Sequence, residues 1–337
     1  MASDRSAPQG PAATLVVTFP ASPRERAIIA DALEGRADPV YLADLPPPAR
    51  APARAGATVL LARNTERELQ DGEAARIGPA RLVQFLTAGV DFVPLSALPP
   101  HVPIAANGGA YAEPMAEHAL AMTLAAAKRL FVEQAELAQG RFNQQTRNRM
   151  LSGGVCGILG FGGIGVATAR LMRALGMRIH AINRRGWSEE PADWIGTPDQ
   201  LDTLLVAADV LVICAPLSHA TAGLLDGARL ARMKPDAILV NLARGEILDE
   251  AALFAHLQAN PRFFACLDAW WVEPVRHGSF RMDHPFLSLP NVVASPHNSA
   301  SVPGTGETGL RRALANVGRA LRGETPLHLV RPEERMR

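Results

Sequence analysis

The chain has 337 residues, of which 48% are hydrophobic and 20% are charged, and its formal net charge is +1. This length allows two domains, and the composition is that of a globular enzyme. The near-neutral charge excludes an electrostatic case for nucleic acid or an anionic membrane, and no apolar run reaches the ~18 residues that span a bilayer. We therefore predict neither nucleic acid nor membrane as a partner. The cysteines at 156, 214 and 266 lie in separate apolar runs, as in the core of a protein from a reducing compartment, so we expect a cytoplasmic location.

The first third of the chain alternates apolar runs with helical segments. Residues 14–19, 58–62 and 81–85 are predicted strands, and residues 24–33 are a predicted helix followed by proline-rich linkers. Such alternation favours a small parallel α/β domain. This region has no convincing glycine fingerprint of its own. Residues 1–11 lack an apolar segment after a basic start, which argues against a secretory signal.

Residues 113–139 have helical spacing and no interior glycine. Pro114 fits the first turn of a helix, where its missing N–H costs nothing. Leu120, Leu124 and Phe131 recur on one face. We predict one long helix that bridges two domains or packs against a partner subunit.

Residues 155–185 contain G-x-G-x-x-G between an apolar run and an alanine-rich helical segment, with a second apolar run after it. This order predicts a βαβ unit whose first turn binds a dinucleotide, the alternative being an ordinary glycine-rich turn. Gly160 would permit the turn, Gly162 the approach of a pyrophosphate, and Gly165 close packing of helix on strand. The helix N-terminus would supply N–H groups and a positive dipole to the phosphates. The expected cofactor-binding turn is Gly160, Phe161, Gly162, Gly163, Ile164 and Gly165.

Strands that start near residues 155, 178, 210, 238, 263 and 292 make six, the number of a full dinucleotide-binding sheet. No predicted strand of the second domain follows the last helix at 305–322. We therefore predict that this helix returns to pack on the first domain. The predicted fold is α/β: two doubly wound parallel-sheet domains, with a Rossmann domain at 107–297 inserted into a discontinuous flavodoxin-like substrate domain at 1–106 plus 298–337.

Three chemically useful side chains follow successive predicted strands: Arg244, Glu273 and His297. Ligands of open α/β sheets bind at the carboxyl ends of strands, which is where these residues are expected. A ketone that accepts a hydride also needs a proton, and histidine is the natural donor near neutral pH. A neighbouring glutamate would orient and stabilise the protonated ring, and the arginine fork could hold a carboxylate and polarise the ketone. Taken singly, such residues are more often structural; together, at successive strand ends beside a glycine fingerprint, they predict a catalytic trio.

The chain resembles the D-isomer-specific 2-hydroxyacid dehydrogenase family from about residue 58 to 322, and within it the glyoxylate/hydroxypyruvate reductases and phosphoglycerate dehydrogenase-like members. The following residues carry the resemblance: Gly89-Val90-Asp91; Asn107 with Ala116-Glu117-His118; the fingerprint at 157–165; Pro216-Leu217 with Thr221; Met233-Lys234-Pro235; residues 241–245 with 249–253; Leu267-Asp268 with Glu273-Pro274; and Pro296-His297.

The resemblance implies that His297 is the general acid/base, Glu273 its partner and Arg244 the residue that binds the substrate carboxylate and carbonyl. It implies that the backbone near Arg63, Asn64, Ala88 and Gly89 holds the substrate carboxylate, and that the chain is a homodimer through the nucleotide domain and the helix after Glu113. Further cofactor contacts are expected from Ala215, Pro216, Thr221, Leu242, Ala243, Arg244, Asp268 and His297.

Two departures from the family pattern stand out. The acidic residue that usually follows the second strand is replaced by Asn183-Arg184-Arg185. Without that carboxylate, a 2′-phosphate is not repelled and two guanidiniums could bind it, so we predict NADP(H) over NAD(H); the alternative is that both arginines are merely solvated. Trp270-Trp271 replaces smaller residues, and these rings either wall the cofactor and substrate pocket or serve as core or interface aromatics.

These patterns predict a 2-oxo acid reductase: hydride transfer from NAD(P)H to a small acid of the glyoxylate or hydroxypyruvate type, giving a D-2-hydroxy acid. A phosphite-type dehydrogenase on the same site is the enzymatic alternative, and a non-catalytic NAD(H)-sensing protein of the corepressor type is the other. The sequence contains no metal-ligand spacing, so no metal site is predicted.

Overall fold

The computed structural model describes residues 13–78 and 80–336. Contacts divide the chain into two units: unit 1 holds the chain up to Ala110 and from Pro303 onward, and unit 2 is Tyr111–Val302. The expected boundaries after residues 106 and 297 stay a prediction, and the expectation for residues 1–11 lies outside the described residues. Among the helices of the described ranges, none combines the length and the apolar character needed to cross a membrane.

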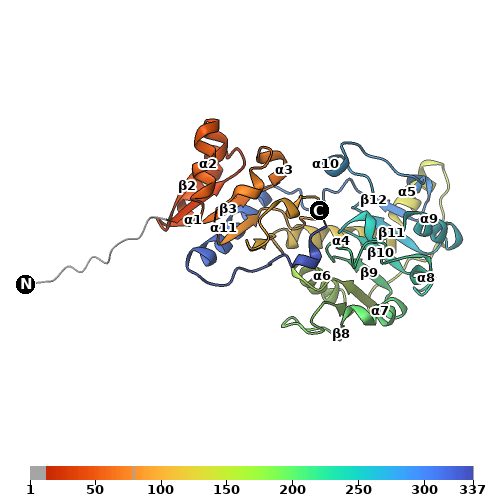
Figure 1. The fold of residues 1–337 in the computed structure, drawn as a ribbon. Helices are drawn as coiled ribbons and strands as arrows, with labels where there is room; N and C mark the ends of the chain where they lie inside the picture. Colours follow the sequence, from red (N-terminus) through yellow and green to blue (C-terminus); the bar gives the residue numbers. More distant parts are fainter. Residues whose placement is uncertain (1–12, 79, 337) are drawn as a thin grey trace, which may run out of the picture. The chain divides into compact units, whose positions relative to one another are not determined.

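Unit 1 is built on a parallel five-stranded sheet in the order β2-β1-β3-β4-β5. Figure 1 labels β2 and β3 of this sheet together with the helices of unit 1. This is the flavodoxin-like strand order. Its strands are β1 (Ala13–Val17), β2 (Ala37–Tyr41), β3 (Val59–Ala62), β4 (Leu82–Phe85) and β5 (Ile104–Ala105). Its helices are α1 (Pro23–Leu33), α2 (Pro47–Ala55), α3 (Thr65–Glu68) and α11 (Thr305–Leu321).

Helix α11 completes unit 1 although it follows unit 2 in the chain. Its Leu310, Leu314 and Val317 are buried in one cluster with β1, β3 and α1. Asn316 Nδ2 donates to Gln84 Oε1 of β4 over 2.6 Å. The prediction of a discontinuous α/β domain that the last helix rejoins is therefore confirmed.

The proline-rich stretch after β2 was wrongly expected to be a linker. It forms α2, with Pro47 in its first turn, where a missing N–H leaves no hydrogen bond unmade. Two of its arginines turn inward: Arg50 Nη2 lies 2.7 Å from Glu73 Oε2, and Arg54 also pairs with this carboxylate. The three side chains are buried. This ion triad fastens α2 to the segment after α3, a tertiary contact that local sequence does not reveal.

We expect Glu73→Gln to destabilise unit 1 by roughly 3 kcal/mol, because it leaves two buried guanidiniums without their counter-charge. The hydrogen bond from Arg50, reinforced by Arg54, lowers the pKa of Glu73 from its ordinary 4.5 to about 2. A lowered folded-state pKa stabilises the fold above the unfolded pKa, and this contribution is lost as pH falls towards 2. Urea unfolding at pH 7 and pH 4 measures both effects. The exposed Glu324→Gln variant is the control, and equal unfolding midpoints for the two variants would contradict the prediction.

Unit 2 is built on a parallel seven-stranded sheet in the order β12-β11-β10-β9-β6-β7-β8. The order from β8 to β11 is that of a dinucleotide-binding sheet, with β12 added at the edge. Its strands are β6 (Val155–Leu159), β7 (Arg178–Ile182), β8 (Trp194–Gly196), β9 (Val210–Ile213), β10 (Ile238–Asn241), β11 (Phe264–Leu267) and β12 (Val292–Ala294). Its helices are α4 (Ala112–Ala127), α5 (Leu130–Ala138), α6 (Gly163–Ala174), α7 (Leu201–Ala207), α8 (Gly227–Leu230), α9 (Glu250–Ala259) and α10 (Pro274–His277). The predicted Rossmann fold is confirmed, and its six expected strands are present.

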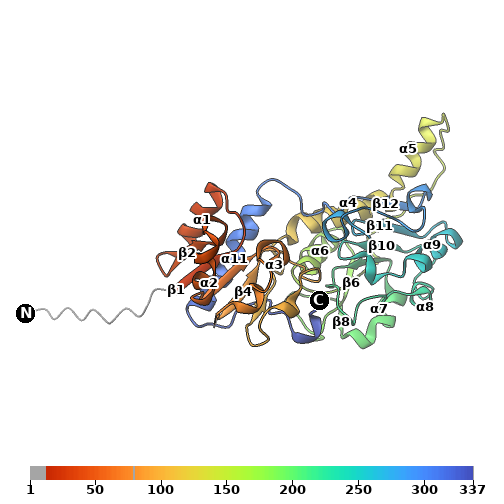
Figure 2. The same ribbon diagram turned by 45° about the horizontal axis from the view of Figure 1, so that its top comes forward.

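Two features of unit 2 differ from the sequence predictions. The three-residue β8 was missed because it is too short to show alternation. The expected single helix at 113–139 was wrong, because the chain breaks between α4 and α5 at Arg129, whose φ of 53° is left-handed. Lys128 Nζ donates to Arg149 O at this break, so the returning chain holds it. Helix α5 projects from the sheet of unit 2 (Figure 2).

Candidate active site

The turn after β6 has the backbone of a dinucleotide-binding loop. Gly160 has a φ of 101°, and a Cβ there would lie 2.4 Å from Ala215 N. A Cβ on Gly165 would lie 2.4 Å from Gly160 O, so this glycine lets α6 pack on the strand. Apart from its two chain neighbours, no heavy atom of the described residues lies within 4 Å of a Cβ built on Gly162, the N-cap of α6. Side chains are therefore excluded at Gly160 and Gly165, where the turn packs against neighbouring backbone. At Gly162 space remains, and this is where the turn would contact a ligand.

Helix α6 directs its first N–H groups toward this space. The first N–H groups of a helix have no intrahelical acceptor, and the dipole of a 12-residue helix adds positive potential at them. Gly163 and Ile164 supply such N–H groups, while the side chain of Phe161 is buried in the core. The turn thus fits a pyrophosphate through its backbone.

The loop after β7 carries the arginines that replace the family's acidic residue. Asn183 shapes it: Oδ1 accepts from Arg185 N over 2.9 Å and from Gly186 N over 2.8 Å. The Arg185 guanidinium lies 4.4 Å from the ring centre of Trp187. Arg184 and Arg185 are both exposed. The loop therefore presents two cations to solvent on a fixed backbone.

The other expected cofactor contacts lie after β9 and β10. Ala215 packs against Gly160, as noted above, and Pro216 follows it. The Thr221 hydroxyl donates to Pro216 O over 2.7 Å, so it braces its own loop. Ala243 N donates to Asn241 Oδ1 over 3.0 Å, and Leu242 is buried. These segments follow neighbouring strands of the sheet, so their backbones lie along the same edge as the glycine turn.

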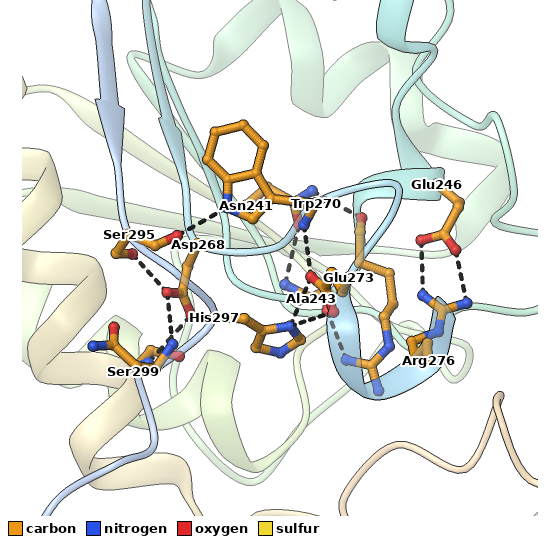
Figure 3. A network of polar contacts seen from close by, with 12 residues as sticks. Asn241, Ala243, Glu246, Asp268, Trp270, Glu273, Arg276, Ser295, His297 and Ser299 are labelled. Carbon is orange, nitrogen blue, oxygen red and sulfur yellow. Dashed lines mark hydrogen bonds and ion pairs between the residues drawn. The ribbon is translucent and has the colours of Figure 1, made fainter. Parts of the chain in front are cut away.

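His297 and Glu273 form the centre of the site (Figure 3). His297 Nδ1 lies 2.8 Å from both carboxylate oxygens of Glu273. The carboxylate is a pure acceptor, so Nδ1 carries the hydrogen and Nε2 is left for another partner. Glu273 is 8% exposed and His297 is 31% exposed, so the ring is the accessible member of the pair.

The Glu273 carboxylate is held in its ionised form. Burial works to raise the pKa of Glu273, but the hydrogen bond and charge of His297, the N–H of Trp270 and the charge of Arg244 outweigh it. The pKa of Glu273 therefore lies below its ordinary value. An ionised carboxylate at Nδ1 fixes the orientation of the imidazole and leaves Nε2 facing away from Glu273.

Arg244 lies near this pair on the turn after β10. Its charge acts on Glu273, and its Nη1 donates to Ala243 O over 2.7 Å. Gly245, the next residue, allows the turn to approach the loop after β11, because a Cβ there would lie 2.3 Å from Trp270 C. The structure thus brings Arg244, Glu273 and His297 together at the carboxyl edge of one sheet, as their order in the chain suggested.

Asp268 has a positioning role that sequence reasoning did not find. This buried carboxylate accepts from Ser295 Oγ over 2.6 Å, Asn298 N over 3.1 Å and Ser299 N over 3.3 Å. His297 lies between these contacts, in the segment 295–299, and has a left-handed φ of 52°. Asp268 therefore holds a backbone conformation that non-glycine residues rarely adopt. Its position after β11 gave a signal, but the loop it binds comes from a distant segment.

Trp270 and Trp271 pack the loop after β11 against neighbouring segments. Trp270 Nε1 donates to Ser295 O over 2.9 Å, and its ring meets Phe280 edge-on. Trp271 Nε1 donates to Leu248 O over 2.8 Å, and its ring stacks on Phe286. The two indoles thus tie the loop after β11 to its neighbours on either side, which supports their role as core aromatics.

The expected substrate contacts of unit 1 lie at the carboxyl edge of its own sheet. Ala88 and Gly89 are in the irregular loop after β4. The backbone N–H groups of Arg63 and Asn64, after β3, donate to the carboxylate of Glu68 over 3.1 Å and 2.7 Å. Asn64 Oδ1 accepts from Glu66 N and caps the short helix α3.

Comparison with known proteins identifies the family. Residues 120–299 match the model of the D-isomer specific 2-hydroxyacid dehydrogenase, NAD binding domain. A D-3-phosphoglycerate dehydrogenase of Archaeoglobus fulgidus is 35% identical over 205 residues, 60% of this chain and 36% of that protein. A glyoxylate/hydroxypyruvate reductase B of Enterobacter agglomerans is 38% identical over 178 residues, 52% of this chain and 54% of that protein. The chain thus spans about a third to a half of these curated relatives.

The solved structure of a proposed formate dehydrogenase from Pyrobaculum aerophilum superposes with a TM-score of 0.77 at 28% identity. The superposition covers 95% of this chain and 99% of the Pyrobaculum aerophilum chain. Two parallel-sheet α/β units, one of them with the strand order of a dinucleotide-binding sheet, match the fold of solved 2-hydroxyacid dehydrogenase relatives. This chain belongs to the D-isomer specific 2-hydroxyacid dehydrogenase family.

Proposed function

We propose that the protein reduces a small 2-oxo acid of the glyoxylate or hydroxypyruvate type to a D-2-hydroxy acid with NAD(P)H. The observation that carries this proposal is the His297–Glu273 pair, 2.8 Å apart, at the same strand edge as Arg244. The match to an NAD binding domain and the resemblance to reductases of these acids support the substrate type.

His297 handles the proton of the reaction. When bound, the nicotinamide supplies the hydride that the carbonyl carbon accepts. His297 donates a proton from Nε2 to the carbonyl oxygen. Its Nδ1–H remains hydrogen-bonded to the carboxylate of Glu273 during this transfer. Because the carboxylate is fixed and ionised, it stabilises the charged ring before transfer and holds the ring orientation throughout.

Arg244 binds and polarises the substrate. Its guanidinium holds the substrate carboxylate and donates to the carbonyl oxygen, where negative charge grows during reduction. Ala88 and Gly89 of unit 1 stay predicted substrate contacts that the family resemblance implies. A planar fork of donors serves both groups of a 2-oxo acid, which lie side by side in one plane.

The cofactor is held by the glycine turn and by the loop after β7. The N–H groups at 163–165 take the pyrophosphate, and the exposed Arg184 and Arg185 take a 2′-phosphate. Asn183 forms the turn that presents them. NADPH is therefore the preferred cofactor, since Asn183 and two arginines stand directly after β7, where a carboxylate would select the free ribose.

The Arg184→Ala, Arg185→Ala double variant tests this preference. We expect kcat/KM for NADPH to fall about 10- to 100-fold, because charged hydrogen bonds to the 2′-phosphate are lost, while NADH changes little. Initial rates with both cofactors measure the ratio. Arg178→Ala, an exposed arginine at the start of the same strand, is the control. Equal losses for NADPH and NADH would contradict a role in selecting the phosphate.

The protein is also proposed to be a homodimer through unit 2. Leu130, Phe131 and Leu137 of α5 are 54–57% exposed, and Phe142 and Met150 after it are both 75% exposed. Apolar side chains gathered on one projecting element are typical of a surface that a partner covers. Light scattering on the wild type should give twice the chain mass, and a Phe131→Glu, Leu137→Glu variant should give one chain mass. A monomeric wild type would refute this assembly.

An initial-rate assay tests the activity. Oxidation of NADPH or NADH is followed by absorbance with glyoxylate, hydroxypyruvate and a panel of other 2-oxo acids. Turnover that gives the D-hydroxy acid supports the proposal. Absence of turnover across the panel would refute it and would favour phosphite oxidation or a nucleotide-sensing protein.

A further inference from the structure

The chain that follows α11 closes a hollow in unit 1. It turns back beside β5, where Ala106 N donates to His328 O over 3.1 Å. Asn316 of α11 holds the same segment, because its Oδ1 accepts from Leu327 N over 2.7 Å and its Nδ2 donates to Leu327 O over 3.0 Å. A hollow of about 360 Å³ remains between α11, the chain just after β5 and this segment. Its volume lies within the range of small-molecule sites, roughly 300–1,000 Å³, and every residue that lines it belongs to unit 1.

The lining of this hollow is basic. Arg312, Arg319 and Arg322 line it, at positions i, i+7 and i+10 of α11 and its C-terminal cap. A helix makes two turns in about seven residues and three in about eleven, so these side chains share one face. The other lining residues are apolar, amides or a histidine. One wall of the hollow therefore carries cations, and the described residues that line it include no carboxylate.

These cations are only partly neutralised. Glu324, just beyond the helix, is shared by two of them: its Oε1 lies 2.6 Å from Arg322 Nε, and its Oε2 lies 3.4 Å from Arg319 Nη1. The charge of Glu34 also acts on Arg322, but Glu34 forms its own ion pair with Arg36. One shared carboxylate balances one of the three cations, so two positive charges remain in excess around the hollow.

Arg312 and His328 meet at this hollow. Arg312 is exposed and forms no hydrogen bond or ion pair with the described residues. The His328 ring lies against Gly108, where a Cβ would be 2.5 Å from Nδ1, and it also has no hydrogen-bond partner among those residues. Partial burial and the charge of Arg312 lower the pKa of His328. Two nitrogen-bearing side chains therefore remain available to an anion, whose charge would relieve the repulsion between them.

We propose that this hollow is a second ligand site, which binds a small phosphorylated molecule. A phosphate ester carries about −1.5 to −2 charges at pH 7 and offers three strong acceptor oxygens. That charge matches the two cations in excess, and guanidiniums bind phosphate oxygens through paired N–H groups. Ala106, Ala315 and Leu327 form an apolar wall against which a short carbon skeleton can pack. The site is separate from the reduction of a 2-oxo acid, so neither proposal depends on the other.

Calorimetric titration of inorganic phosphate and glycerol 3-phosphate tests the site. The whole chain is first saturated with oxidised cofactor, so that the glycine turn and the loop after β7 are occupied. Arg312→Ala is compared with Arg311→Ala, which removes the same charge from a neighbour whose Nη1 lies 3.3 Å from Asp31 Oδ2 and which does not line the hollow. We expect the wild type to bind both phosphates, the ester more tightly. Arg312→Ala should raise both dissociation constants about tenfold or more, and Arg311→Ala should change them little.

The His328 ring gives a second readout. A dianion bound beside it should raise the pKa of His328, because a negative charge favours the protonated imidazole. Proton NMR follows the imidazole resonances with pH, with and without saturating glycerol 3-phosphate, and His328→Gln assigns them. The resonance of His101, an exposed histidine of unit 1, is the internal reference. An upward shift at His328 supports the site, and an unchanged titration of His328 at saturation would refute it.

Three calorimetric outcomes would overturn the proposal. Arg312 is exposed and bonds to no described residue, so its replacement should leave the fold intact, which circular dichroism checks. No heat of binding with either phosphate would exclude the site. Equal affinities of Arg312→Ala and Arg311→Ala would place any bound phosphate elsewhere on the chain. Citrate that binds more tightly than glycerol 3-phosphate would reject a phosphorylated ligand in favour of a polycarboxylate.

Discussion

Replacing His297 by asparagine is expected to lower kcat for 2-oxo acid reduction by about three orders of magnitude. A positioned general acid contributes about 10²–10⁴ to the rate, and asparagine has no proton to give at neutral pH. Asparagine is the informative choice because residue 297 has a left-handed φ of 52°, a conformation that asparagine tolerates well. Its amide can still donate to Glu273, so the pocket keeps its shape.

The measurement is steady-state kinetics with NADPH and the best 2-oxo acid from the panel. KM for the cofactor should stay within about threefold, because the glycine turn is untouched. His101→Asn, an exposed histidine of unit 1, controls for the loss of an imidazole. A kcat that stays within tenfold of the wild type would remove His297 from the proton-transfer step.

The order of chemistry-bearing residues along the chain predicted which side chains gather at one strand edge better than any single motif did. Arg244, Glu273 and His297 each follow a buried strand, and parallel strands bring their carboxyl ends to one edge. That argument needs only the positions of the strands, which apolar runs reveal. The distances between the side chains, and the shared contact of Nδ1 with both oxygens of Glu273, could not follow from it.

What the sequence could not reveal depends on contacts between distant segments. Asp268 holds Asn298 and Ser299, and Glu68 holds Thr18, but nothing local marks either carboxylate as a partner of that backbone. The break between α4 and α5 at Arg129 was also not predictable, because no glycine or proline at this position signals a left-handed conformation. In each case tertiary contacts override or supplement local preference.

The same network connects the fold to the chemistry. The Asp268 carboxylate and the Trp270 indole both bind the segment at 295–299, so the loop is fixed on either side of His297 (Figure 3). His118 Nε2 on α4 lies 2.9 Å from Ser295 Oγ and extends this support to the helix. A ring that is held from its backbone and from its Nδ1 loses little freedom when the substrate arrives, which is how pre-organisation lowers a barrier.

Glu273→Gln is expected to lower kcat for reduction by about 100-fold. The variant keeps the size of the side chain and removes the negative charge that faces the ring of His297. Proton donation during reduction leaves a neutral ring, and proton uptake during oxidation of the D-hydroxy acid creates a positive one. Steady-state kinetics in both directions measure the loss of kcat.

The pH dependence of stability should change in the same variant. The folded-state pKa of Glu273 lies below its ordinary value, despite burial, because of His297, Trp270 N and Arg244. The ionised carboxylate therefore stabilises the fold above its ordinary pKa of 4.5, and that contribution is lost as pH falls through the lowered folded-state pKa. Glu273→Gln removes this part of the acid dependence. Glu246→Gln, which removes a carboxylate paired with Arg276 nearby, is the matched control. If both variants kept the wild-type kcat and pH profile, Glu273 would be a structural ion pair and the proton would have to come from an unassisted histidine.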